Sequence, residues 1–457
     1  MSLSSSLSIV LQGLQVEQEA LSVTSNNIAN VNTPGYSREV ANLEETPPVT
    51  FGTLDFGTGV QLANIQGIRD NVLQLRLNQE TQNQGSLNAL STGLNQIQTI
   101  FNEPAGAGLQ SLISQFFESF QQLSSDPTNI GLRQAVIGDA QSLAAGFNQS
   151  ATALVTQQQN ANQAVVGDVR QINELTAQIA QLNTQISEAS GGGANPNSFI
   201  DQRSQLVNQL SHLIDVQSIT ADGSSLTLTT NDGAPLVVGN QSFNLQTQTV
   251  AGAVQDVFSQ GKDITSEIQS GDLAGQIQLR DQTIPGILNN LDTLANGIDT
   301  TVNTQNAAGF DLHGNPGANI FVPPAAVAGS ALNLAVAITD PTKIAASADG
   351  TVGNNANATA LANLQNQPII SGETPIDFYS GLVFDVGNQA QTASNQLSGE
   401  NLLVQQLQDQ INSVSGVSLN EEGTNLVLYQ NAFQAAEQVA AVINTLFQDT
   451  INMVPTA

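Results

Sequence analysis

Residues 419–454 of the chain read LNEEGTNLVLYQNAFQAAEQVAAVINTLFQDTINMV. Apolar side chains recur at every seventh position of this stretch, which is the spacing of a coiled-coil seam and predicts a helix. This first row comprises Leu419, Leu426, Phe433, Ala440, Phe447 and Val454. A second row lies beside it and comprises Leu428, Ala432, Ala435, Val439, Val442 and Leu446. Because the two rows are wider than one partner helix would cover, we expect at least two packing partners.

The other end of the chain supplies a matching helix. Its apolar row has the same seven-residue spacing and comprises Leu7, Leu14, Leu21 and Ile28. We therefore expect the two termini to pair as a two-helix coiled coil. The pair would leave its flanking rows in water, where apolar surface costs roughly 25 cal/mol per Å², and further copies of the chain could cover them. Alternatively, both helices lie inside a monomeric core, which periodicity alone does not exclude.

Helical patterns also fill much of the chain between the termini. They cover residues 68–101, where Gly85 could interrupt the helix, then 109–123 and 132–147. A heptad pattern then runs from Val165 to Ile186, and after the flexible turn at 191–196 a helical pattern returns over 199–214. This part of the chain predicts an antiparallel helical hairpin. A further helical pattern covers 288–302.

Strand patterns are confined to shorter stretches. Residues 39–63 are rich in Thr, Pro, Gly and Val and predict an extended segment or a hairpin. Residues 225–230 alternate, and the Asn231-Asp232-Gly233 sequence that follows is typical of a hairpin turn. We therefore place a small β insertion at 216–264.

These patterns predict a mainly α fold with inserted β structure. It comprises a terminal two-helix coiled coil, an α-rich domain with long antiparallel helices, and a small β domain inserted in the middle. We place the terminal domain at 1–33 with 418–457, and the α-rich domain at 34–215 with 265–320 and 376–417. The β insertion occupies 216–264, and a mixed β and irregular segment occupies 321–375.

Charge and composition exclude several classes of partner. The 457 residues include nine Lys and Arg against 38 Asp and Glu, which gives a formal net charge of −29. A nucleic-acid backbone or an anionic membrane surface would repel this chain. The most apolar run, residues 325–339, is too short to span a bilayer, so we expect no membrane insertion. Residues 1–37 contain no Lys or Arg, which argues against a cleavable signal peptide.

The residues that usually carry catalysis or bind metals are scarce. There is no cysteine, and His212 and His313 are the two histidines, so thiolate metal sites and a two-histidine zinc helix are excluded. Residues 311–315 lack the alternating oxygen ligands of a calcium loop and predict a polar turn. We expect adjacent glutamates such as Glu421 and Glu422 to be solvated. The sequence thus predicts no catalytic residue, cofactor or metal, and no enzyme.

A motif with the sequence SNNIANVNTPGYSR, residues 25–38, follows the first helix. Its asparagines compete with the helix for backbone hydrogen bonds, and Pro34-Gly35 favours a type II turn, so the motif predicts a helix end. It also resembles the N-terminal signature of bacterial flagellar axial proteins, in which an Asn-Asn-Ile-Ala-Asn segment precedes Gly-Tyr or Gly-Phe. The matching positions are Asn26, Asn27, Asn30, Gly35 and Tyr36.

Within that superfamily the chain is similar to the hook-associated protein 1 family. The similar stretches are Ser37-Arg38 and residues 201–207, 270–281, 309–317, 415–422 and 429–436. The chain departs from the family at Phe433, where tyrosine is common, and at Ala436, where a small polar residue is common. The side chains at these two positions therefore supply no hydrogen bond.

The resemblance implies a structural, non-catalytic subunit that joins the flagellar hook to the filament. It further implies self-association in a ring, contacts with the hook protein and with the second junction protein, hook-associated protein 3, and an export chaperone bound to the C-terminal segment. It implies type III export without a cleavable signal peptide, and an extracellular location at the hook–filament junction. Two alternatives remain at this point: another axial subunit such as a hook protein, and an extracellular adhesin with a helical stalk.

Overall fold

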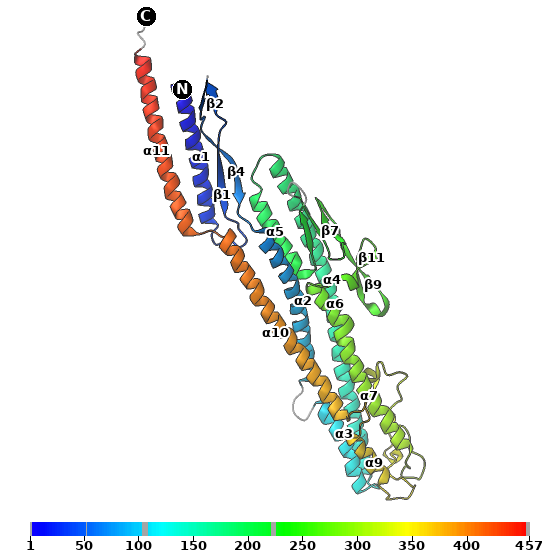
Figure 1. Ribbon diagram of the computed structural model, residues 1–457. Helices are drawn as coiled ribbons and strands as arrows, with labels where there is room; N and C mark the ends of the chain where they lie inside the picture. The colour runs from blue at the N-terminus through cyan, green and yellow to red at the C-terminus, as the bar shows by residue number, and fades with distance from the viewer. Residues whose placement is uncertain (1, 52, 103–107, 221–224, 454–457) are drawn as a thin grey trace.

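The chain folds into an elongated molecule with both termini at the same end (Figure 1). The structure is a computed structural model that describes residues 2–51, 53–102, 108–220 and 225–453. Helices α1 (Leu3–Ala29) and α11 (Leu419–Asn452) pack against each other at that end. Ser2 and Ser418 cap them, since each side chain accepts a hydrogen bond from a backbone N–H three residues further on.

A β-hairpin packs against α1 on the side opposite α11 (Figure 1). Strands β1 (Glu39–Glu45) and β4 (Val60–Gly67) pair antiparallel, with a register shift between Asn42 and Leu43. The smaller strands β2 (Val49–Phe51) and β3 (Leu54–Phe56) extend this hairpin toward the N-terminus of α1. The sequence had placed residues 39–67 with the α-rich domain. Instead they form one unit with the terminal helices, because β1 and β4 pack against α1. We call α1, β1–β4 and α11 the terminal unit.

Helices form most of the rest of the molecule. They are α2 (Asn71–Phe101), α3 (Leu109–Ser125), α4 (Ile130–Gly191), α5 (Asn197–Leu213), α6 (Asp272–Gln278), α7 (Ile284–Ala307) and α10 (Pro375–Ser415). One π-helical turn, Leu279–Thr283, joins α6 to α7. Helices α4 and α5 form the predicted hairpin, and α10 runs along α2 before the chain enters α11.

The structure joins two predicted helical patterns into one helix and leaves the helix that contains Gly85 uninterrupted. The patterns at 132–147 and 165–186 belong to one 62-residue helix, α4, because residues 148–164 contain neither Gly nor Pro to end it. Helix α2 also continues through Gly85. A Cβ at this position would lie 2.0 Å from the backbone oxygen of His212, so the glycine allows close packing rather than a break.

The β insertion forms two small antiparallel sheets beside α4 and α5. The first has the order β5-β6-β7-β8, and its strands are Gln217–Thr220, Leu226–Thr229, Pro235–Val238 and Gln241–Ser242. The second has the order β11-β10-β9, from Lys262–Asp263, Gln255–Ser259 and Leu245–Thr249. Leu228 and Val237 of the first sheet and Val257 of the second join the apolar row of α4 in one core.

Residues 308–374 wrap around the far end of α3, α4 and α7. The sequence suggested mixed β and irregular structure for 321–375, but the structure places two short helices there, α8 (Ser330–Asn333) and α9 (Ala356–Asn363), with isolated bridges in place of regular strands. Side chains of α7 provide the hydrogen bonds that a strand ladder would otherwise supply. The Asn303 Oδ1 atom accepts from the backbone N–H groups of Ile320 and Phe321, at 2.8 and 3.0 Å.

The largest core lies in this half of the molecule. Phe116, Phe117 and Phe120 of α3 pack with Phe321 and with apolar side chains of α4 and α7. The architecture confirms the predicted fold class: mainly α, with paired terminal helices, long antiparallel helices and an inserted β part. Within the described ranges, none of the helices combines the length and apolar character that crossing a membrane requires.

Candidate functional site

The first apolar rows of the two terminal helices lie partly buried in the contact between them. Leu7, Leu14, Leu21 and Ile28 of α1 are half-buried, as are Leu426, Phe433, Ala440 and Phe447 of α11. Leu419, at the first turn of α11, is exposed, and Val454 lies outside the described residues. Val16, Ala20 and Val23, which flank the predicted row on α1, are the apolar residues that this helix buries fully.

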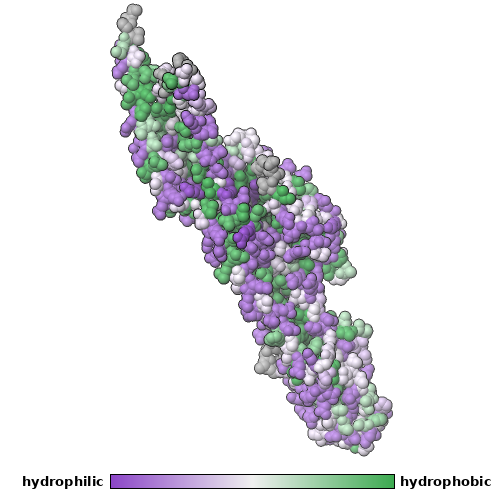
Figure 2. Space-filling view, viewed as in Figure 1, coloured by the Kyte–Doolittle hydropathy of each residue, from purple (hydrophilic) through white to green (hydrophobic). Residues whose placement is uncertain are grey.

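The second row of α11 has no partner within the described part of this chain that removes it from water. Its large members Leu428, Val439, Val442 and Leu446 expose between 47% and 60% of their surface. Figure 2 shows apolar surface gathered over this end of the molecule. Soluble monomers rarely expose a continuous apolar patch, and larger patches are typical of protein–protein contact sites.

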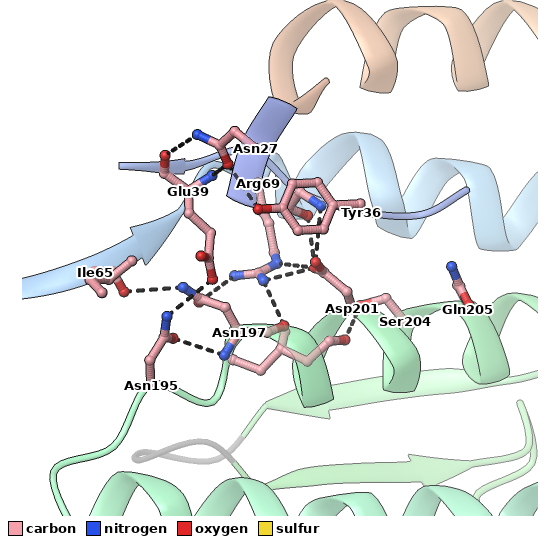
Figure 3. Close-up of polar contacts among 12 residues, drawn as sticks. Asn27, Tyr36, Glu39, Ile65, Arg69, Asn195, Asn197, Asp201, Ser204 and Gln205 are labelled. Carbon is pink, nitrogen blue, oxygen red and sulfur yellow. Dashed lines mark hydrogen bonds and ion pairs between the residues drawn. The ribbon is translucent and has the colours of Figure 1, made fainter. Parts of the chain in front are cut away.

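A polar joint lies where the terminal unit meets the long helices, and Figure 3 shows it from Asn27 at one edge to Asn197 and Asp201 of α5. The Asn27 Nδ2 atom donates to the Glu39 backbone oxygen at 2.8 Å and to the Glu422 Oε2 atom at 3.2 Å. The Asn27 Oδ1 atom accepts from the Tyr36 hydroxyl at 2.8 Å and from the Glu39 backbone N–H at 2.9 Å. This buried amide therefore uses both of its donors and accepts two hydrogen bonds.

The other positions of the motif shape the loop around Asn27. Asn30 donates to the Asn26 backbone oxygen and so terminates α1. Gly35 adopts a φ of 74°, in the left-handed region that glycine favours. Burial raises the pKa of Tyr36, and the nearby carboxylates of Glu39, Asp201 and Glu422 raise it further, so its hydroxyl stays protonated and donates.

Glu422 corrects one expectation from the sequence. It is 1% exposed rather than solvated, and its Oε1 atom accepts from the Arg38 Nε atom at 2.7 Å. The preceding residue, Glu421, is the solvated one and pairs with Arg38 from the outside, at 2.7 Å. Glu422 is buried because α11 starts directly against the end of α1, where Asn27 and Arg38 supply the donors that a buried carboxylate requires.

Asp201 of α5 joins the same loop to the long helices. Its carboxylate accepts from the backbone N–H and the hydroxyl of Ser37, at 2.9 and 2.8 Å. Arg69, just before α2, donates to Asp201 through Nε and Nη2 at 2.9 and 2.7 Å, and to Asn197 as well. The Asn197 side chain in turn donates to the backbone oxygen of Ile65 in β4, at 3.1 Å.

The motif at residues 25–38 predicted some residues of the joint and missed others. Asn27 and Tyr36 lie in the joint, and Asn26, Asn30 and Gly35 lie beside them. Arg69, Asn197 and Glu422 were not singled out as site residues. The scarcity of basic residues could have drawn attention to Arg69, but it gave no signal for Asn197 or Glu422.

The joint consists of hydrogen bonds and ion pairs between distant parts of one chain. Its carboxylates are engaged by arginine, asparagine or serine donors. Throughout the described ranges, no three side chains of His, Cys, Asp or Glu gather closely enough to hold a metal ion.

Two family models match the chain. Residues 94–321 match the family described as "Flagellar hook-associated protein FlgK helical domain", and residues 9–36 match "Flagella basal body rod protein". The first match alone covers about half of the chain. The chain belongs to the flagellar hook-associated protein 1 family. The first match contains the α4–α5 hairpin and the β insertion. The second contains most of α1, including Asn27, and the loop that follows α1 as far as Tyr36.

Curated members of this family resemble the chain along almost its whole length. Hook-associated protein 1 of Salmonella typhimurium is 29% identical over 555 aligned positions, covering 99% of this chain and 100% of that protein. The Bacillus subtilis protein is 29% identical and covers 96% of both. A solved structure described as the flagellar hook junction protein FlgK from Burkholderia pseudomallei has the same fold, with a TM-score of 0.67 at 20% identity, covering 74% of this chain and all of that one.

Proposed function

We propose that this chain is a structural subunit of the bacterial flagellum that joins the hook to the filament by self-assembly through its terminal helices. The observation that carries the proposal is the exposed second row of α11, an apolar surface left over after α1 has covered the first row. Covering this row with further subunits would remove it from water. The match to the helical domain of this family favours a junction protein over the alternative of a hook protein.

The partners follow from the same assignment. We propose that copies associate with each other in a ring, with the hook protein on one side and hook-associated protein 3 on the other. Before assembly, an export chaperone would cover the exposed row of α11. The chain would leave the cell by the flagellar type III route without a cleavable signal peptide and act outside it. We propose no catalytic role.

Placing a charge in the exposed row tests this function. Val439→Asp should reduce incorporation of the protein into flagella to a small fraction of the wild-type level, because the introduced carboxylate would be desolvated in the contact. Incorporation is measured by immunoblotting of flagella purified from cells that carry the variant as their single copy. Gln438→Asp is the matched control, since it adds the same charge one position away on the exposed polar face of the helix.

Circular dichroism and secretion into the medium show whether each variant folds and leaves the cell. If Val439→Asp is secreted and still reaches the wild-type level in flagella, the exposed row is not an assembly surface. The proposed mechanism of joining would then be wrong.

A further inference from the structure

A groove lies between the first three turns of α1 and the end of the β-hairpin. It has a volume of about 860 Å³. Its main lining residues are Ser5, Ser8, Ile9 and Gln12 of α1 with Phe56 and Thr58 of the hairpin. None of its lining residues is charged, in a chain whose net charge is −29. Such a lining suits an apolar helix face with small polar residues at its edges.

The exposed row of α11 has the chemistry that fits this groove. Val439, Val442 and Leu446 project from one face at helical spacings of three and four residues. The stretch from 438 to 448 carries no charged residue. Since the groove is also uncharged, bringing the two together desolvates no ion and creates no repulsion between two acidic copies.

The groove and the row also lie at the same height along the terminal unit. Asn27 of α1 and Glu422 of α11 are hydrogen-bonded and mark one level of this antiparallel pair. Ser8 is nineteen residues before Asn27, and Ala441 is nineteen residues after Glu422. Because both helices rise by about 1.5 Å per residue, Ser8 in the groove lies level with Ala441 and its neighbour Val442.

The two surfaces are on opposite sides of the terminal unit. Figure 1 shows α11 on one side of α1 and the hairpin on the other. The row of one copy can therefore meet the groove of the next while both copies point the same way. A contact between two different surfaces of identical chains repeats around a ring or along a helix, whereas a two-fold contact stops at a dimer.

We infer that the α1–hairpin groove of one copy binds the Val439–Leu446 face of α11 from the neighbouring copy. This inference rests on the proposed function, because it names the surface that covers the exposed row. The hairpin thereby becomes an assembly element, which the sequence did not suggest for residues 39–63. The occupant is a second copy of this chain, since the row matches the groove in charge, height and direction.

Mixed cysteine cross-linking tests the contact directly, because the chain has no cysteine of its own. A tagged Ser8→Cys variant is mixed with an untagged Val442→Cys variant at a concentration where light scattering shows self-association, and the mixture is oxidised mildly. We expect a disulfide between tagged and untagged chains, at least about tenfold more abundant than in a mixture diluted until it is monomeric. Thr424→Cys replaces Val442→Cys as the control, because Thr424 is also exposed on α11 but lies near the other end of the helix.

Each other outcome is decisive. Disulfides confined to pairs of identical variants would indicate a two-fold contact and overturn the inference. Self-association without the mixed disulfide, or with Thr424→Cys reacting equally well, would also overturn it while leaving the proposed function standing. A wild-type chain that stays monomeric at every concentration would instead count against the proposed function itself.

A charge in the groove provides a second test that needs no cross-link. Ser8→Glu should weaken self-association at least about tenfold, because the carboxylate would be buried without a partner. Ser413→Glu adds the same charge on the exposed surface of α10 and should leave self-association unchanged. Equal affinities for the two variants would place the contact elsewhere.

Discussion

Removing the Arg38 side chain should open the joint far more than removing its exposed partner. Arg38 binds two adjacent glutamates, and their exposures differ sharply: the side chain of Glu421 is 60% exposed, whereas that of Glu422 is 2% exposed. An exposed ion pair contributes about 0–1 kcal/mol. Leaving a buried carboxylate without its cation costs about 3–5 kcal/mol. Asn27 still donates to Glu422 in the variant, so we expect a cost near the lower end, about 3 kcal/mol.

Native-state hydrogen exchange is the suitable assay, because it reports the opening of one part of a protein. In Arg38→Met, backbone amides in the last turns of α1 and the first turns of α11 should exchange about 100-fold faster, since each 1.4 kcal/mol is a factor of ten. In Glu421→Gln, the same amides should change by less than about fivefold. Amides in the α3 core should keep their rates in both variants.

A double-mutant cycle with Glu422→Gln then isolates the pair. The two substitutions should be strongly non-additive, because once Glu422 is neutral Arg38 no longer leaves a buried charge behind. If Arg38→Met and Glu421→Gln accelerate exchange equally, or if the double variant shows simple additivity, the buried pair does not hold the joint and this reasoning fails.

Three further predictions concern the rest of the molecule. Burial and the neighbouring Asp272 carboxyl raise the pKa of Asp168 to about 7. The folded chain therefore binds more protons here than the unfolded chain, and the contribution of this group to stability falls as pH rises from about 4 to about 7. Asp168→Asn should raise the thermal unfolding midpoint at pH 8 but change it little at pH 4. Gly275→Ala should lower the free energy of unfolding by about 1–3 kcal/mol, measured by denaturant titration. The reason is that a Cβ there would lie 2.5 Å from the backbone oxygen of Ser86. Phe116→Ala should cost about 3–5 kcal/mol by leaving a cavity, measured by calorimetry, since three phenylalanine rings surround that side chain.

Each of these predictions has a result that contradicts it. An Asp168→Asn variant with the same midpoint shift at pH 4 and pH 8 would show that the carboxyl pair does not titrate in this range. Gly423→Ala is the control for Gly275→Ala, because a Cβ at Gly423 meets open space and should stabilise α11 slightly. A loss at Gly423 as large as that at Gly275 would reject the packing argument. A Phe116→Ala cost below about 1 kcal/mol would mean that the core collapses around the missing ring.

The sequence predicted those parts of the fold that local periodicity determines. The terminal helices, the α4–α5 hairpin and the β insertion each have a regular apolar pattern and a recognisable turn, such as Asn231-Asp232-Gly233. The full length of α4 was missed because residues 148–164 have a weaker apolar pattern, although nothing in them ends a helix. The helix α9 was missed because the stretch before it is rich in Gly and Pro and its pattern spans only two turns.

The joint was the harder part to predict, because its contacts connect residues that are far apart in the chain. Asn27 and Glu422 are 395 positions apart, and Ser37 and Asp201 are 164 apart. No local pattern indicates that a glutamate in the first turn of α11 will be buried, since its neighbour Glu421 occupies the same turn and is solvated. The motif around Asn27 predicted a helix end correctly, but its partners depend on how β4, α2 and α5 meet.

The backbone passes between the terminal unit and the long helices at two points, from β4 into α2 and from α10 into α11. Two covalent crossings define a line. The covalent chain alone would let the terminal unit swing about that line, so the hydrogen bonds from Ser37 to Asp201 and from Asn197 to Ile65 are what resist this motion.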